Sequence, residues 1–91
     1  MPVYEPRVTV WHTALKHGLT EHEVKSAYFN AQEVYFLDDK DKDRRFYVGL
    51  GENGTPVELV ALNTDEGVLI VHAMKPARKH FVNRLDRGDK R

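Results

Sequence analysis

The stretch VLIVHAMKPARKHF, residues 68–81, decides how the chain is interpreted, because it joins a strand, a histidine and a group of cations. The aliphatic run 68–71 is typical of a buried strand. His72 follows at the spacing of Val68 and Ile70, so we expect it on their face of the sheet, close to the strand end. The cations come directly afterwards, around Pro76: Lys75, Arg78, Lys79 and His80. Such a junction suits a phosphate-binding site, but it also suits a strand that leads into a solvated helix.

Composition limits the chain to one domain. Its 91 residues leave no room for a second hydrophobic core, and the absence of cysteine rules out disulfides and cysteine zinc sites. No apolar run approaches the ~18 residues of a membrane span. We therefore expect one soluble, cytoplasmic domain over residues 1–91, without membrane contact. Residues 1–7 should form an extended lead-in and residues 87–91 a flexible tail.

Charge is distributed unevenly along a chain whose formal net charge is zero. Residues 75–91 carry seven Lys and Arg against two Asp, whereas residues 1–74 carry seven Lys and Arg against twelve Asp and Glu. A basic segment of this kind can face a polyanion or an acidic partner, and it can also be a solvated helix and tail. Charge alone therefore leaves both interpretations open.

The pattern of the chain predicts an α+β domain. Thr20 and Glu23 form a capping box ahead of an apolar helical face, and the segment 12–17 before Gly18 is predicted as a shorter helix. Strands are expected at 8–11, 34–37, 45–50, 57–62 and 68–74, and a final helix at 79–86. The prediction is an antiparallel sheet of about four to five strands with two N-terminal helices and one C-terminal helix. The segments 8–11 and 34–37 are the candidate sheet edges. Five aromatic residues are expected in the core: Trp11, Tyr28, Tyr35, Phe36 and Phe46.

Histidine spacing does not indicate a metal site. The chain has five histidines, but His12 and His17 are five residues apart, not four, and no pair matches a tight zinc motif. The sequence GLGENG at 49–54 fits GxGxxG, yet it lies between two strands rather than before a helix. We therefore expect neither a metal nor a cofactor.

The order of these features resembles the BrnT family of bacterial type II toxin–antitoxin toxins, small ribonucleases with a RelE-like sheet. The features that carry the resemblance, over residues 10–81, are Trp11, Lys16-His17-Gly18, the acidic helix from Thr20, Asp38-Asp39, Arg45 opening a strand that ends at Gly49, the pattern Ile70-Val71-x-Ala73-x-Lys75, and Arg78-Lys79. The chain departs from the family pattern at Leu69 and Met74, where arginine is usual, and at His72, which replaces serine. The resemblance implies a RelE/BrnT-like fold and a metal-independent endoribonuclease that cleaves RNA, blocks translation and is held by an antitoxin.

RNA cleavage without a metal needs a base for the 2′-hydroxyl, a cation for the phosphate and an acid for the leaving oxygen. The candidate catalytic residues are His72, Lys75, Arg45, Lys16 and His17, and the candidate RNA-binding residues are Arg78, Lys79, His80 and His12. Structural roles compete with these: His72 as a hydrogen-bonded core residue, Arg45 as an ion-pair partner of the Asp-rich loop, and His17 as a helix cap. Glu23 is expected as the capping-box carboxylate rather than as a base.

Three functions fit this sequence. The first is a toxin-type endoribonuclease whose partners are RNA and a cognate antitoxin, as a homodimer or a toxin–antitoxin hetero-oligomer. The second is a non-catalytic module of the same fold that binds RNA or an acidic protein, which the absence of arginine at Leu69 and Met74 favours. The third is a structural subunit that dimerises through an edge strand. We expect the first.

Overall fold

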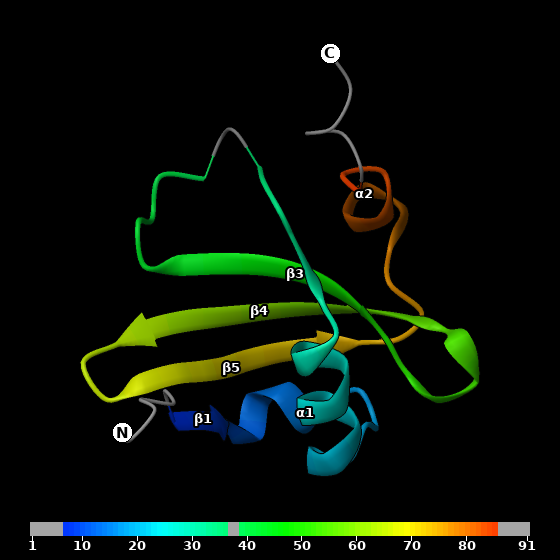
Figure 1. Cartoon of the computed structure of the whole chain (residues 1–91), viewed down its shortest axis with the longest axis horizontal. Coiled ribbons are helices and arrows are strands. Elements are labelled where there is room, and N and C mark those ends of the chain that lie inside the picture. The colour runs from blue at the N-terminus through cyan, green and yellow to red at the C-terminus, as the bar shows by residue number, and fades with distance from the viewer. Residues whose placement is uncertain (1–6, 37–38, 86–91) are drawn as a thin grey trace, which may run out of the picture.

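The computed structural model describes residues 7–36 and 39–85 of the chain. One five-stranded sheet, in the order β1-β5-β4-β3-β2, forms its centre (Figure 1). In chain order the elements are β1 (Arg7–Val10), the 3-10 turn η1 (His12–Leu15), α1 (Glu21–Phe29), β2 (Gln32–Val34), β3 (Arg44–Leu50), the 3-10 turn η2 (Glu52–Gly54), β4 (Pro56–Thr64), β5 (Gly67–Met74) and α2 (Lys79–Val82). The two edges of the sheet are β1 and β2, but β2 covers 32–34, so the strand expected at 34–37 is wrong in its bounds and shares only Val34 with β2. Of the expected lead-in 1–7, residues 1–6 lie outside the described residues and Arg7 belongs to β1; the expected tail 87–91 also lies outside the described residues.

The sheet is mixed, so the expected antiparallel sheet is wrong. β1 pairs with β5 in parallel, with Val8 beside Val68 and Val10 beside Ile70, whereas the other neighbouring strands pair antiparallel. Alternation within a strand shows which side chains share a face, but it does not give the direction of the neighbouring strand. That direction is set here by the path through α1 to the far edge and the antiparallel return through β3, β4 and β5.

The expected set of helices is also wrong. η1 is a 3-10 turn of four residues, and α2 is a single turn of four residues that ends at Val82 instead of 86. Asp86 lies outside the described residues. α1 is the one helix longer than a turn in the described part of the chain. Segments this short gain little from helix propensity, and their conformation is decided by packing against the sheet.

α1 begins where the capping box predicts. The Glu23 N–H donates to the Thr20 hydroxyl at 3.1 Å, and the Thr20 N–H donates to the Glu23 carboxylate at 2.8 Å. The buried face of the helix then lies directly on β3, because Gly49 leaves space for its backbone. A Cβ atom at Gly49 would lie 2.1 Å from the carbonyl oxygen of Ala27. The close approach of helix and sheet therefore depends on glycine at this position.

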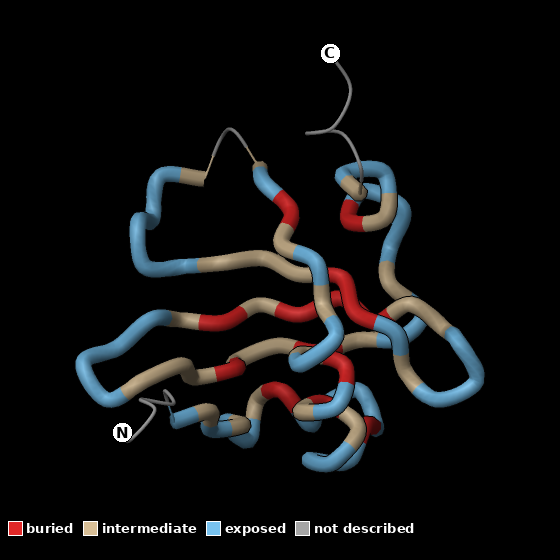
Figure 2. Tube along the Cα trace, viewed as in Figure 1, coloured by how far each residue is buried: buried red, intermediate tan, exposed pale blue. Residues whose placement is uncertain are grey.

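The two faces of the sheet are covered unequally, although β3, β4 and β5 all contain buried residues (Figure 2). On one face, α1 and η1 pack on Leu59, Ala61 and Ile70, which are almost completely buried. On the other face, Phe81 of α2 packs with Val34 and Val48 in a smaller cluster. We call this second side the open face of the sheet.

Trp11 and Tyr35 are surface residues, contrary to the expectation that they lie in the core. Their exposed fractions are 47% and 69%. Aliphatic side chains from β4, β5 and α1 fill the main core instead. Even a small domain therefore closes its core here without these two large aromatic residues.

Candidate functional site

Glu58 of β4 is the one fully buried charged side chain in the described part of the chain. The Arg78 guanidinium donates to it through Nε at 3.0 Å and through Nη2 at 2.6 Å. The backbone N–H of Arg78 donates to the same carboxylate at 2.8 Å, and His72 Nε2 lies 2.7 Å from its other oxygen. We call Glu58, His72 and Arg78 the Glu58 cluster.

Glu58 is ionised despite its burial. Burial raises the pKa of this carboxyl group, but hydrogen bonds from the Arg78 side chain, the Arg78 backbone and His72 outweigh it and lower the pKa of Glu58 from 4.5 to about 2. An ionised carboxylate only accepts hydrogen bonds, so His72 Nε2 is the donor. Nδ1 is then the nitrogen of neutral His72 that can take up a proton.

A β-bulge turns His72 onto the open face. Consecutive residues 60 and 61 of β4 lie opposite His72 and Ile70, so Val71 between these two has no counterpart. The inserted residue reverses the alternation of β5. Ile70 is buried under α1, whereas His72 reaches Glu58 on the opposite side. The expectation that His72 shares a face with Val68 and Ile70 is therefore wrong.

The segment of η1 brings a second predicted histidine to the cluster. This segment lies against β5, and the Thr13 hydroxyl donates to the Val71 carbonyl at 2.6 Å. The ring of His17 then lies edge-on to that of His72, with 5.5 Å between the centroids and an interplanar angle of 76°. The imidazole of His17 therefore contacts the imidazole that belongs to the Glu58 cluster.

Lys75 is bound to the start of α1 rather than to the Glu58 cluster. Its Nζ lies 3.0 Å from a carboxylate oxygen of Glu23. The backbone hydrogen bond from Thr20, followed by the bond from Lys75, lowers the pKa of Glu23. Glu23 is thus an ionised acceptor that caps the helix and holds Lys75 near the end of β5.

The remaining predicted residues are scattered, apart from His80, which packs against the rings of Phe36 and Phe81. Arg45 pairs with Glu33 of β2 at 3.6 Å, and its Nη1 donates to the Lys42 carbonyl in the Asp-rich loop, so its ion-pair partner is Glu33 and not an aspartate of that loop. His12 packs on the neighbouring indole ring, with 5.0 Å between centroids. Two further predicted residues are exposed to solvent: Lys16 and Lys79.

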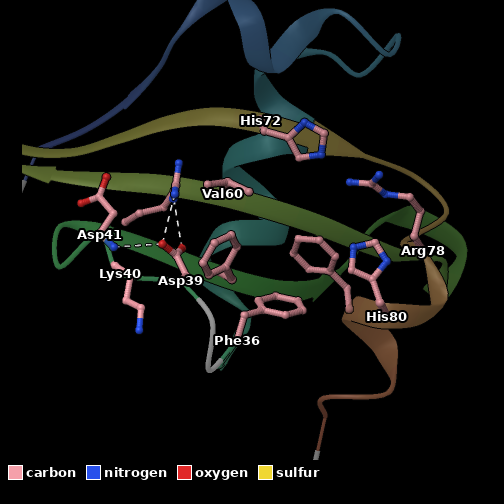
Figure 3. A pocket seen from close by; sticks show the side chains of 11 residues that line it. Phe36, Asp39, Lys40, Asp41, Val60, His72, Arg78 and His80 are labelled. Carbon is pink, nitrogen blue, oxygen red and sulfur yellow. Dashed lines mark hydrogen bonds and ion pairs between the residues drawn. The ribbon is translucent and has the colours of Figure 1, made fainter.

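A groove of about 640 Å³ lies on the open face next to the Glu58 cluster (Figure 3). Its apolar surface comes from Phe36, Phe46, Val60 and Phe81. At one end His72, Arg78 and His80 point toward one another, and at the other end lie Asp39, Lys40 and Asp41. Arg44 also lines the groove and is bonded to Asp39. The groove therefore combines an aromatic surface with cations at both ends.

Sequence reasoning missed Glu58 and Arg44. Glu58 had a signal, since it is the lone charge inside the otherwise apolar strand VELVAL and faces away from the residues that contact α1. The sequence signal for Arg44 was weaker, because either of the adjacent arginines, Arg44 or Arg45, could have paired with the acidic loop. Arg44 is the one that does so, with Nε and Nη2 each 3.0 Å from Asp39.

Comparison with known proteins gives no relative. No family model, no curated protein and no solved structure matches the chain.

Within residues 7–36 and 39–85, no three His, Cys, Asp or Glu side chains are grouped as a metal ion would need. The same part of the chain contains no helix with the length and apolar character to cross a membrane.

Proposed function

We propose that the chain is a toxin-type endoribonuclease that cleaves RNA in the cytoplasm at the Glu58 cluster and is held inactive by an antitoxin protein. The observation that carries the proposal is the contact between His17 and His72 beside an arginine fixed by a buried carboxylate. The resemblance of Lys16-His17-Gly18 and the segment 70–79 to BrnT toxins supports the toxin type.

The chemistry needs only groups that this site supplies. The 2′-oxygen of the RNA attacks the adjacent phosphorus, and the bond from phosphorus to the 5′-oxygen breaks. The products are a 2′,3′-cyclic phosphate and a free 5′-hydroxyl. One imidazole takes the proton of the 2′-hydroxyl and the other gives a proton to the leaving oxygen. His72, whose Nε2–H is held by Glu58, presents Nδ1 for one of these transfers, and His17 provides the other.

Arg78 is the group that would bind the phosphate. Its Nε and Nη2 donate to Glu58, which fixes the guanidinium plane, while its side chain is 51% exposed. The N–H groups on the outer side can therefore donate to phosphate oxygens. Because the carboxylate holds the arginine in place, little conformational freedom is lost when the phosphate binds.

Cleavage of a single-stranded RNA by the purified protein in a chelating buffer tests the proposal. We expect products that end in a 2′,3′-cyclic phosphate, and a loss of at least about a hundredfold in rate for His72→Gln and for His17→Gln. His22→Gln is the matched control, because His22 is an exposed histidine on α1. Intact RNA with the wild-type protein, or equal rates in all three variants, would overturn the proposal.

A non-catalytic RNA-binding module is the second candidate. It is favoured by the burial of Glu58, since an arginine bonded to a buried carboxylate is also a purely structural anchor. In that case the wild-type protein would bind the same RNA with a steep dependence on salt and release no product.

A further inference from the structure

We propose that the groove of Figure 3 binds one nucleotide of single-stranded RNA, with its base on the aromatic surface and its two flanking phosphates on Arg78 and Arg44. This inference rests on the proposed function for its ligand, RNA, and it assigns a binding role to Arg44. It requires no cleavage.

Arg44 and Arg78 are held in the same way at opposite ends of the groove. Arg44 donates through Nε and Nη2 to Asp39, and Arg78 donates through the same two atoms to Glu58. In both pairs the carboxylate is on the inside: Asp39 is 12% exposed beside Arg44 at 43%, and Glu58 is 0% exposed beside Arg78 at 51%.

Each arginine is also held against an aromatic ring. The Arg44 Cζ atom lies 5.9 Å from the centroid of Phe46, and the Arg78 Cζ atom lies 5.9 Å from the centroid of Phe81. A guanidinium that is held by a carboxylate and a ring keeps one orientation before a ligand arrives. Both arginines therefore present their outer N–H groups to the groove as preformed phosphate-binding groups.

The surface between the two arginines suits a base. Phe36 and Phe46 are half-buried neighbours, with 4.8 Å between their ring centroids, and both line the groove with Val60. Aromatic rings of this kind stack on the face of any unpaired base. In a duplex the bases are stacked on one another and turned away from the backbone, so a duplex would reach the arginines without reaching the rings.

Binding of a non-cleavable strand tests the inference separately from catalysis. The probe is a fluorescent single-stranded oligonucleotide with 2′-O-methyl groups, which lacks the attacking hydroxyl, and fluorescence anisotropy is measured over a series of salt concentrations. We expect Arg44→Gln to weaken binding about tenfold, as for the loss of one charge-assisted hydrogen-bonded contact. The slope of log K against log salt should fall by about 0.7, the value for one phosphate contact on a single strand.

Lys25→Gln is the matched control, because it also removes one positive charge but lies on α1, on the covered side of the sheet. Equal weakening by Arg44→Gln and Lys25→Gln, or equal affinity for a duplex of the same length, would overturn the inference. Binding that depends on Arg44 without cleavage of ordinary RNA would support the inference and refute the ribonuclease. Cleavage of ordinary RNA that Arg44→Gln leaves unchanged would support the ribonuclease and refute the inference.

Discussion

Arg78 donates to Glu58 from both its backbone N–H, at 2.8 Å, and its guanidinium Nη2, at 2.6 Å. The chain that leaves β5 is therefore bound to β4 through main chain and side chain of one residue. The Ala77 N–H adds a bond of 2.8 Å to the Pro56 carbonyl at the start of β4. Together these bonds place α2 over the open face and define one end of the groove.

Acid should destabilise the wild-type protein more than a variant that lacks the buried carboxylate. The pKa of Glu58 is about 2 in the folded chain against 4.5 ordinarily, so the unfolded chain binds the proton more readily. The stability that this carboxylate contributes, roughly 3 kcal/mol, is complete above the ordinary pKa and is lost as the pH falls toward the folded pKa. Urea unfolding at several pH values should give a flatter profile for Glu58→Gln. Glu66→Gln, in the exposed turn before β5, is the control, and a profile parallel to the wild type for Glu58→Gln would contradict the prediction.

Removal of the Arg78 guanidinium should destabilise the folded protein, because the buried Glu58 carboxylate then loses its main partner. In Arg78→Gln the burial of Glu58 is no longer offset by its main partner, so the pKa of Glu58 should rise. We expect a loss of about 3–5 kcal/mol in the free energy of unfolding at neutral pH, as for other buried charges that lose a partner. Chemical denaturation measures the loss, and carboxyl NMR measures the pKa. Lys79→Gln, which removes an exposed positive charge at the start of α2, should change neither, and a similar loss in both variants would point to a general effect of charge.

A side chain at position 49 should separate α1 from the sheet. The Cβ atom of Gly49→Ala would lie 2.1 Å from the Ala27 carbonyl oxygen, so the helix backbone must move. We expect a loss of at least about 3 kcal/mol in stability. Gly18→Ala meets nothing within 4 Å and carries only the cost of its φ of +92°, about 1 kcal/mol. Thermal unfolding of both variants checks the difference, and equal melting temperatures would show that the contact between α1 and β3 is not as close as described.

Loss of the Lys75 ion pair should change stability little. Lys75 and Glu23 are 39% and 20% exposed, and exposed ion pairs typically contribute less than about 1 kcal/mol. Lys75→Met should therefore unfold within a few degrees of the wild-type melting temperature. A large drop would assign Lys75 a structural role. An unchanged melting temperature makes Lys75→Met usable in the RNA assay, because any loss of cleavage then reflects the site itself.

Local signals in the sequence predicted local structure well. The capping box at Thr20 and Glu23 needs only four consecutive residues, and it starts α1 as expected. The strands 45–50, 57–62 and 68–74 were recognisable from apolar runs between glycine-containing turns, and they form β3, β4 and β5 with ends displaced by one or two residues. Each of these signals is complete within the segment that it describes.

Features that depend on contacts between two segments far apart in the chain could not be predicted from local sequence patterns. The parallel pairing of β1 with β5 depends on the path of the whole chain, and the bulge at Val71 depends on the register against β4. Because of the bulge, the prediction for His72 was wrong: strict alternation assigned it to the same face as Ile70, and the structure places it on the opposite face. His17 and His72 were both candidates, but only the structure shows that their rings are in contact.

The hydrogen bond from the Thr13 hydroxyl to the Val71 carbonyl has a consequence for assembly. β1 pairs with β5 only as far as Ile70, so the rest of β5 would otherwise offer unpaired carbonyl groups to a strand of another molecule. A side-chain hydroxyl occupies one of these groups at the bulge, and the bulge interrupts the regular ladder that an incoming strand requires. The irregularity that orients His72 therefore also makes this border of the sheet a poor template for aggregation.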